Sequence, residues 1–243
     1  EKYYPEIKTN LAEIVSPMIA MGRYLKNYYG PDTKVVFIGP CVAKKSEYVD
    51  EEVSDAIDAV LTFKELKEIF VQSNIELNKL EESEFDSPHA FLGKSFPLSG
   101  GLLKSADISG DILQKEIIVV EGKNRVVEIM EEVSNGKLKS KIIDILFCEG
   151  CINGPAIDSD LNYYSRREKV IGFIENNINS FDKNVWKSAL YNSRGINLKR
   201  RFNSKPQRRP MPSEQEIKNI LAKTNKFQTT DELNCGSCGY TTC

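Results

Sequence analysis

The sequence is short of several features that would assign it to a familiar class. Histidine occurs once in 243 residues, and the 33 basic and 35 acidic side chains nearly cancel, leaving a net charge of -2. This balance gives no general attraction to nucleic acids or acidic membranes. No run reaches the roughly 18 consecutive apolar residues of a membrane-spanning helix, and no secretory signal opens the chain. We therefore expect a cytoplasmic protein with neither membrane nor nucleic acid as a partner.

Cysteine is where the sequence is distinctive. Three thiols stand together in Cys235-Gly-Ser-Cys238-Gly-Tyr-Thr-Thr-Cys243, two more are Cys148 and Cys151, and the sixth is Cys41. Thiolates are preferred ligands of iron–sulfur clusters and of structural zinc, and a Cys-x2-Cys spacing lets two sulfurs from one turn reach the same centre. Cytoplasmic thiols stay reduced, so a disulfide framework is not expected. We predict that the chain carries iron and sulfur.

Two other uses of the cysteines remain open at this point. Cys41, Cys148 and Cys151 could bind structural zinc without any redox role. Cys148 and Cys151 could also form a dithiol of the exchange type, although Glu149 between them disfavours the thiolate.

The alternation of strand and helix signals predicts an α/β fold. Apolar, β-branched runs predict strands at 34–39, 117–120 and 142–147, with a further apolar stretch at 55–61. Periodicity and capping signals predict helices at 17–28, 63–72, 124–134, 163–178 and 214–223. The succession over 115–147 is a βαβ unit, which implies parallel strands. We expect two lobes whose parallel or mixed sheets are flanked by helices, with the strand at 34–39 buried on both faces.

Two of these strands run directly into a cysteine, Cys41 in one lobe and Cys148 in the other. In open α/β sheets, ligands gather beyond the carboxyl ends of the strands. The two lobes are therefore expected to hold one cluster between these ends. The stretch Phe96–Gly101 opens a further helix, and its paired glycines either let the backbone approach a bulky ligand or form an ordinary turn.

The basic segment, residues 194–212, contains seven Lys and Arg, three prolines and no acidic residue. We expect it to lie as a strap across an acidic face of its own domain, the alternative being an anionic partner such as nucleic acid.

The stretch Pro40-Cys41-Val-Ala-Lys44-Lys-Ser-Glu47 resembles the second signature of the iron-only ([FeFe]) hydrogenase large subunit, Pro-Cys-x-x-Lys-x-x-Glu. Four further stretches resemble the same family in the same order: Tyr3–Glu6, Ser16-Pro17, Ser99–Gly101 and Cys148–Gly154. The resemblance spans about residues 1–202. After a linker and short helix at 203–231, residues 232–243 are similar to the start of a separate four-cysteine [4Fe-4S] module. Hydrogenase-like chains that carry this module are often regulatory or sensory.

The resemblance implies roles for individual residues. Cys41, Cys148 and Cys151 would ligate a [4Fe-4S] cluster, with one sulfur bridging to a diiron unit. Lys44 would hydrogen-bond a cyanide of that unit and Glu47 would orient the loop, so both are catalytic only if the unit is present; a merely structural ion pair is the alternative. Ser99, Gly100 and Gly101 would border the cofactor. The C-terminal ligands would be Cys235, Cys238 and Cys243.

The chain also departs from the family pattern. The third signature has Cys-x3-Cys followed by three glycines, glutamine and proline, whereas this chain has Cys148-x2-Cys151 followed by Asn153-Gly154-Pro155. Ala12 stands where catalytic members have a proton-relay serine, Met18 replaces a glutamine, and Gly39 a methionine. An alanine cannot pass a proton. Fast hydrogen turnover is therefore not expected.

We also expect an excerpt of a longer protein, since the family's first signature, with the remaining cluster ligand, lies just upstream of the first matching stretch. The cluster, and any diiron unit, could then be absent from this form. Two functions stay open: redox or hydrogen sensing with electron transfer to signalling or electron-transfer domains on either side, and catalysis by an [FeFe] hydrogenase. Whether the chain is an enzyme is left undecided by the sequence.

Overall fold

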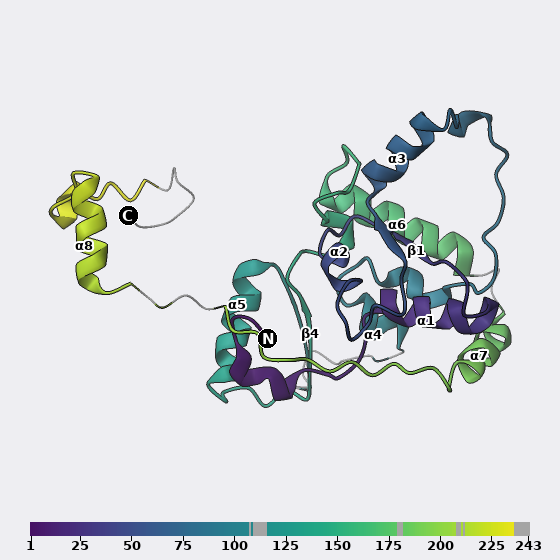
Figure 1. Ribbon diagram of the computed structural model, residues 1–243, viewed down its shortest axis with the longest axis horizontal. Helices are drawn as coiled ribbons and strands as arrows, with labels where there is room; N and C mark the ends of the chain where they lie inside the picture. The colour runs from purple at the N-terminus through teal and green to yellow at the C-terminus, as the bar shows by residue number, and fades with distance from the viewer. Residues whose placement is uncertain (107, 109–115, 179–181, 208–209, 211, 236–243) are drawn as a thin grey trace. The chain divides into compact units, whose positions relative to one another are not determined.

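The computed structural model describes residues 1–106, 108, 116–178, 182–207, 210 and 212–235 (Figure 1). The chain divides into two compact units. The larger comprises Glu6–Asn203, and the smaller combines Glu1–Pro5 with Ser204–Cys243.

The first part of the larger unit is a two-stranded parallel sheet with three helices. In chain order, after the 3-10 helix η1 (Pro5–Asn10), its elements are α1 (Pro17–Tyr29), β1 (Val36–Ile38), α2 (Lys44–Glu47), β2 (Ala59–Leu61) and α3 (Phe63–Gln72). Strands β1 and β2 pair in parallel, with Val36 opposite Ala59. Helix α3 begins at a capping box in which Thr62 and Glu65 satisfy each other's backbone N–H groups.

The second part repeats the parallel pairing. Its elements are η2 (Leu77–Lys79), η3 (Phe91–Ser95), α4 (Gly101–Ser105), β3 (Ile117–Glu121), α5 (Lys123–Ser134), β4 (Ile142–Leu146), η4 (Cys151–Asn153), α6 (Tyr163–Ile178) and α7 (Lys183–Asn192). Strands β3 and β4 pair in parallel from Ile117 opposite Ile142, and α5 is the crossover helix between them (Figure 1). The smaller unit contains α8 (Glu214–Lys223) and η5 (Thr229–Asp231).

The core lies between α1 and the β1–β2 sheet. Its buried members are Val15, Met18, Ile19, Val35, Val53, Ala56, Ile57 and Val60. Gly22 permits the close approach of α1, because a Cβ at that position would lie 2.5 Å from the carbonyl oxygen of Ala56. This packing fixes the turn after β1, where Cys41 stands.

The α/β fold class with short parallel sheets is confirmed, and α3 and α6 have the predicted bounds. The prediction that the first strand is buried on both faces is wrong. Phe37 packs on the core, but Val36 and Ile38 on the opposite face are 48% and 41% exposed. Within the described residues β1 pairs only with β2, and its second face is open to solvent at these two positions. Helix α7 was not predicted; its Trp186 ring lies 5.4 Å from that of Phe91.

No helix in the described part of the chain is both long and apolar enough to cross a membrane.

Candidate metal centre

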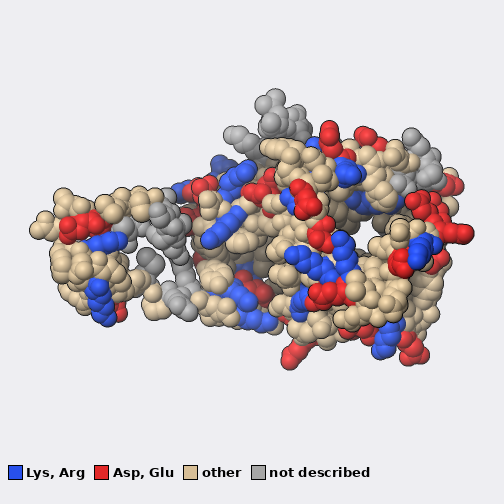
Figure 2. Space-filling model, turned by 90° about the horizontal axis from the view of Figure 1, so that it is seen from above, with Lys and Arg blue, Asp and Glu red and all other residues tan. Residues whose placement is uncertain are grey.

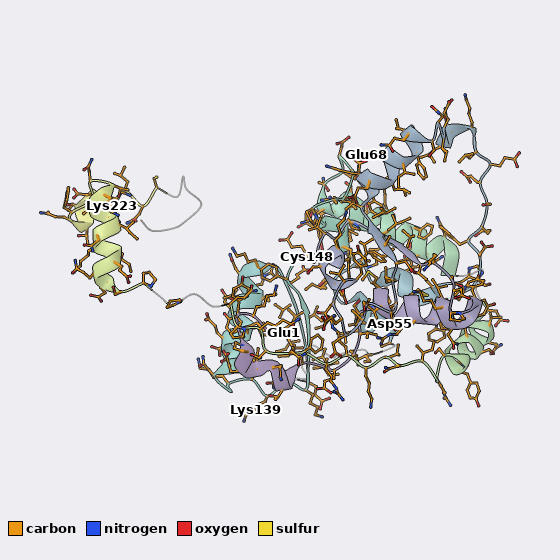
Figure 3. The ribbon with its side chains drawn as sticks, in the orientation of Figure 1. Glu1, Asp55, Glu68, Lys139, Cys148 and Lys223 are labelled. Atoms are coloured by element: carbon orange, nitrogen blue, oxygen red, sulfur yellow. The ribbon has the colours of Figure 1, made fainter. Side chains whose placement is uncertain are left out.

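The three signature cysteines follow the ends of two strands that belong to different sheets. Cys41 comes after β1 and Pro40, and Cys148, labelled in Figure 3, comes after β4. Cys151 opens the 3-10 helix η4 behind Gly150. All three are free thiols; Cys148 is exposed, and Cys41 and Cys151 are partly buried.

Backbone contacts bring the two cysteine-bearing loops together. The N–H of Ala156 donates a hydrogen bond of 3.1 Å to the carbonyl oxygen of Pro40. Gly154 packs so tightly on the same residue that a Cβ there would lie 2.9 Å from both the Cβ and the oxygen of Pro40. The loop that carries Cys151 is therefore docked directly on the residue that precedes Cys41.

The pKa of Cys151 indicates that the cysteine side chains also lie near one another. Burial raises the pKa of the Cys151 thiol, and the neighbouring sulfurs of Cys148 and Cys41 raise this pKa further. Lys44 opposes the shift, because an ammonium group favours the thiolate. The structure thus gathers Cys41, Cys148, Cys151 and Lys44 into one neighbourhood.

The candidate metal ligands at this place are thiols. Among the described residues, no three His, Cys, Asp or Glu side chains are grouped closely enough to hold a single metal ion. The three cysteines are nevertheless of the donor type that iron–sulfur clusters and structural zinc both take as ligands.

Lys44 and Glu47 lie on the short helix α2, immediately after Cys41. The Lys44 ammonium donates to Oε2 of Glu47 at 2.5 Å, and Oε1 of Glu47 accepts a 3.0 Å hydrogen bond from Arg200. Arg200 also reaches Oδ2 of Asp50 at 3.4 Å. The prediction that the basic segment lies against acidic residues of its own domain is confirmed for Arg200. On the face seen in Figure 2, basic and acidic side chains are interspersed.

Gly100 and Gly101 lie at the start of α4, and each has its own local reason to be glycine. A Cβ on Gly101 would lie 1.8 Å from the carbonyl oxygen of Ser95, so the backbone of η3 leaves no room for a side chain at this position. Gly100 has a φ of +73°, a left-handed conformation that favours glycine. Pro97, two residues before Ser99, lies against the cysteine loop. A Cβ placed on Gly150 of that loop would be only 2.7 Å from the carbonyl oxygen of Pro97. The Ser99–Gly101 stretch is thus close in sequence to a residue bordering the cysteines.

Side-chain hydrogen bonds hold the cysteine loop onto α6. Asn153 Nδ2 donates to Oε2 of Glu149 at 2.9 Å, and Nη2 of Arg166 donates to Oδ1 of Asn153 at 2.8 Å. The sequence pointed to Asn153, because this residue departs from the glycines of the family signature. Nothing in the sequence pointed to Arg166, because its position on a predicted helix does not reveal which loop it faces.

The C-terminal cysteines belong to the smaller unit. Cys235 is exposed, and Cys238 and Cys243 lie outside the described residues.

The chain is similar to known proteins over much of its length. The family described as "Iron only hydrogenase large subunit, C-terminal domain" matches residues 1–155. Iron hydrogenase 1 of Clostridium pasteurianum is 32% identical over 165 residues, which cover 59% of this chain and 29% of that protein. The periplasmic [Fe] hydrogenase large subunit of Nitratidesulfovibrio vulgaris is 26% identical over 202 residues, covering 63% and 47% respectively. The chain therefore spans less than half the length of these relatives.

Solved structures share the fold. An [FeFe]-hydrogenase studied for oxygen inactivation of its H cluster superimposes with a TM-score of 0.53 at 19% identity, covering 70% of this chain and 61% of that one. A variant of the [FeFe]-hydrogenase HydA1 from Chlamydomonas reinhardtii gives 0.52 at 18% identity, covering 70% and 62%. Because the family match extends over more than half of its length, this chain belongs to the family of the iron-only hydrogenase large subunit, C-terminal domain.

Proposed function

We propose that this chain binds a [4Fe-4S] cluster through Cys41, Cys148 and Cys151 and acts as a redox- or hydrogen-responsive module. One observation carries the proposal: free thiols from two separate strand ends are gathered in one place with Lys44 beside them. Thiolates are the ligands that such clusters take in proteins. A fourth ligand has to come from another group.

A bound cluster supplies one-electron redox chemistry. The chain's own residues prepare the site for it. The docking of Gly154 on Pro40 holds the Cys41 and Cys151 loops together, so little ordering is left to be done on binding. Burial and the neighbouring sulfurs raise the pKa of the Cys151 thiol, and the positive charge of Lys44 offsets part of this shift toward the thiolate, which is the form that binds iron.

Two positions favour sensing over fast turnover. Ala12 stands where the family resemblance places a proton-carrying serine, and a methyl group neither donates nor accepts a proton. Met18, which is 4% exposed, places a thioether where the family has a glutamine amide. A catalytic hydrogenase is the second candidate, favoured by the names of the relatives and by the presence of Lys44 and Glu47 at the signature positions that would face a diiron unit.

Hydrogen evolution from reduced viologen separates the two functions. The full-length protein, matured and purified without oxygen, is compared with its Ala12→Ser variant. We expect a visible-absorbing, redox-active cluster with hydrogen evolution near background, and a rise in evolution when the serine is restored. Rapid evolution by the unaltered protein would establish the catalytic alternative.

We also propose that Cys235, together with Cys238 and Cys243, contributes to a second cluster that exchanges electrons with neighbouring domains. Cys235→Ser should then lower the iron content without affecting the signal of the first cluster. An unchanged iron content would refute this role.

A further inference from the structure

Glu47 is shared between two cations. One carboxylate oxygen accepts from Lys44 at 2.5 Å and the other from Arg200 at 3.0 Å. The side chains are largely withdrawn from solvent, with 13% exposure for Glu47, 13% for Arg200 and 23% for Lys44. Charge-assisted hydrogen bonds in such surroundings are strong and directional. The orientation of Glu47 is therefore set from both sides.

Arg200 is itself firmly placed. Its second nitrogen reaches Asp50 at 3.4 Å, and its guanidinium group lies 5.1 Å from the centre of the Phe202 ring. Its backbone N–H donates to the carbonyl oxygen of Glu13 at 3.2 Å. A guanidinium with this many contacts has little rotamer freedom left.

The stretch just before Arg200 is anchored as well. Val15 N–H donates to the oxygen of Leu198 at 2.9 Å, and Arg23 donates to the oxygen of Asn197 at 2.7 Å. Arg23 is held in turn by a paired interaction with Asp55 at 2.8 Å. The basic segment therefore presents Arg200 from a fixed backbone.

The charges in this cluster balance. Lys44 and Arg200 face the carboxylates of Glu47 and Asp50. If the guanidinium were removed, Oε1 of Glu47 would lose its cationic partner, and the Glu47 carboxylate could turn out of its present orientation together with Lys44. The ammonium group would then be drawn away from its present place beside the cysteines.

We infer that Arg200 is a positioning residue: it holds Glu47 so that Glu47 holds Lys44 at the cysteine site. The inference deepens the proposed function, because it names a residue far along the chain that sets the charge next to the sulfurs. No cluster is required for the contact itself, so it can be tested in metal-free protein.

The test is nuclear magnetic resonance of lysine ammonium groups in the ¹⁵N-labelled chain, with the Lys44 signal assigned by its loss in Lys44→Arg. An ammonium held in a partly buried ion pair exchanges its protons slowly. We expect Arg200→Ala and Arg200→Gln to speed this exchange about tenfold, as when a charge-assisted hydrogen bond is weakened. Arg200→Lys, which keeps a cation but cannot fork to Glu47 and Asp50 together, should restore part of the protection.

Arg201→Ala is the matched control. Arg201 is the exposed neighbour of Arg200 and has no ion pair with any described residue. The Arg201→Ala substitution should leave the proton exchange of the Lys44 ammonium group unchanged. Unchanged exchange at Lys44 in folded Arg200→Ala or Arg200→Gln would overturn the inference, as would an equal effect of Arg201→Ala. Circular dichroism identifies which variants are folded, and Arg200→Lys, which keeps the charge and the stem, decides the question if the others are not.

A second arm uses chain reconstituted with iron and sulfide in the presence of a small thiol that can serve as the fourth ligand. The midpoint potential of the cluster should shift in Arg200→Ala and stay in place in Arg201→Ala; an unshifted potential in both would overturn the inference for the loaded site. If no cluster forms even in the unaltered chain, the proposed function fails while the ammonium measurement still decides the role of Arg200.

Discussion

Replacing Gly154 by alanine tests whether the two cysteine loops depend on close docking. The backbone at Gly154 has φ -61° and ψ 150°, which any residue adopts, so the substitution introduces no backbone strain. Its effect comes entirely from the new methyl group. That group would lie 2.9 Å from both the Cβ and the oxygen of Pro40, and 3.2 Å from the oxygen of Cys151.

The neighbours cannot easily move aside. Pro40 is a rigid ring, and its oxygen already accepts the N–H of Ala156 at 3.1 Å. Overpacking of this kind typically costs about 1–3 kcal/mol. The added methyl group would lie between Pro40 and the Cys151 backbone and push them apart. Gly154→Ala should therefore also move Cys151 away from Cys41 and reduce the amount of iron bound.

Urea unfolding followed by circular dichroism, and iron per chain after anaerobic reconstitution, measure the two effects. Gly172→Ala is the matched control. It lies inside α6 with open space where its Cβ would go, so it should stabilise the helix by about 1 kcal/mol and leave iron binding unchanged. A Gly154→Ala protein with the stability and iron content of the unaltered chain would refute the docking argument.

Three further predictions concern the β1–β2 part of the larger unit. Ile19→Ala removes a fully buried core side chain and should cost about 2–5 kcal/mol of unfolding free energy in urea; a cost below that of a surface substitution would contradict the core assignment. Thr62→Ala breaks the capping box of α3 and should cost about 0.5–2 kcal/mol by the same measurement, whereas no loss would show that the cap is dispensable. Hydrogen bonds from the Lys45 side chain, then from Thr62, lower the pKa of Glu65 from its ordinary 4.5 to about 2. Since the folded pKa is the lower one, the stability contributed by Glu65 is present above about pH 4.5 and is lost as the pH falls toward 2. Lys45→Met should move the Glu65 titration upward in NMR spectra, and an unmoved titration would exclude Lys45 as the main cause.

Local signals in the sequence were sufficient for much of the fold. The Thr62–Glu65 capping box predicted the start of α3, and the βαβ pattern predicted the parallel pairing of β3 with β4. The exposure of Val36 and Ile38 could not be predicted, because burial of a strand depends on how many layers join its sheet.

For the site, the residues that stand in motifs were predictable and their partners were not. The signature cysteines and Lys44 could be picked from short spacings. Arg200 contacts Glu47 across 153 positions of sequence, and Arg166 contacts Asn153 across 13 positions from the adjacent helix. Such pairings follow from tertiary packing, which no local pattern records.

The most direct test of the account is the iron and acid-labile sulfide content of a chain that keeps only the three signature thiols. Cys235, Cys238 and Cys243 are replaced by serine, and the protein is reconstituted without oxygen in the presence of a small thiol that can serve as the fourth ligand. We predict about four iron and four sulfide per chain, falling close to zero when Cys41→Ser or Cys151→Ser is added. Iron and sulfide contents that are unaffected by Cys41→Ser would contradict a shared site for the three cysteines.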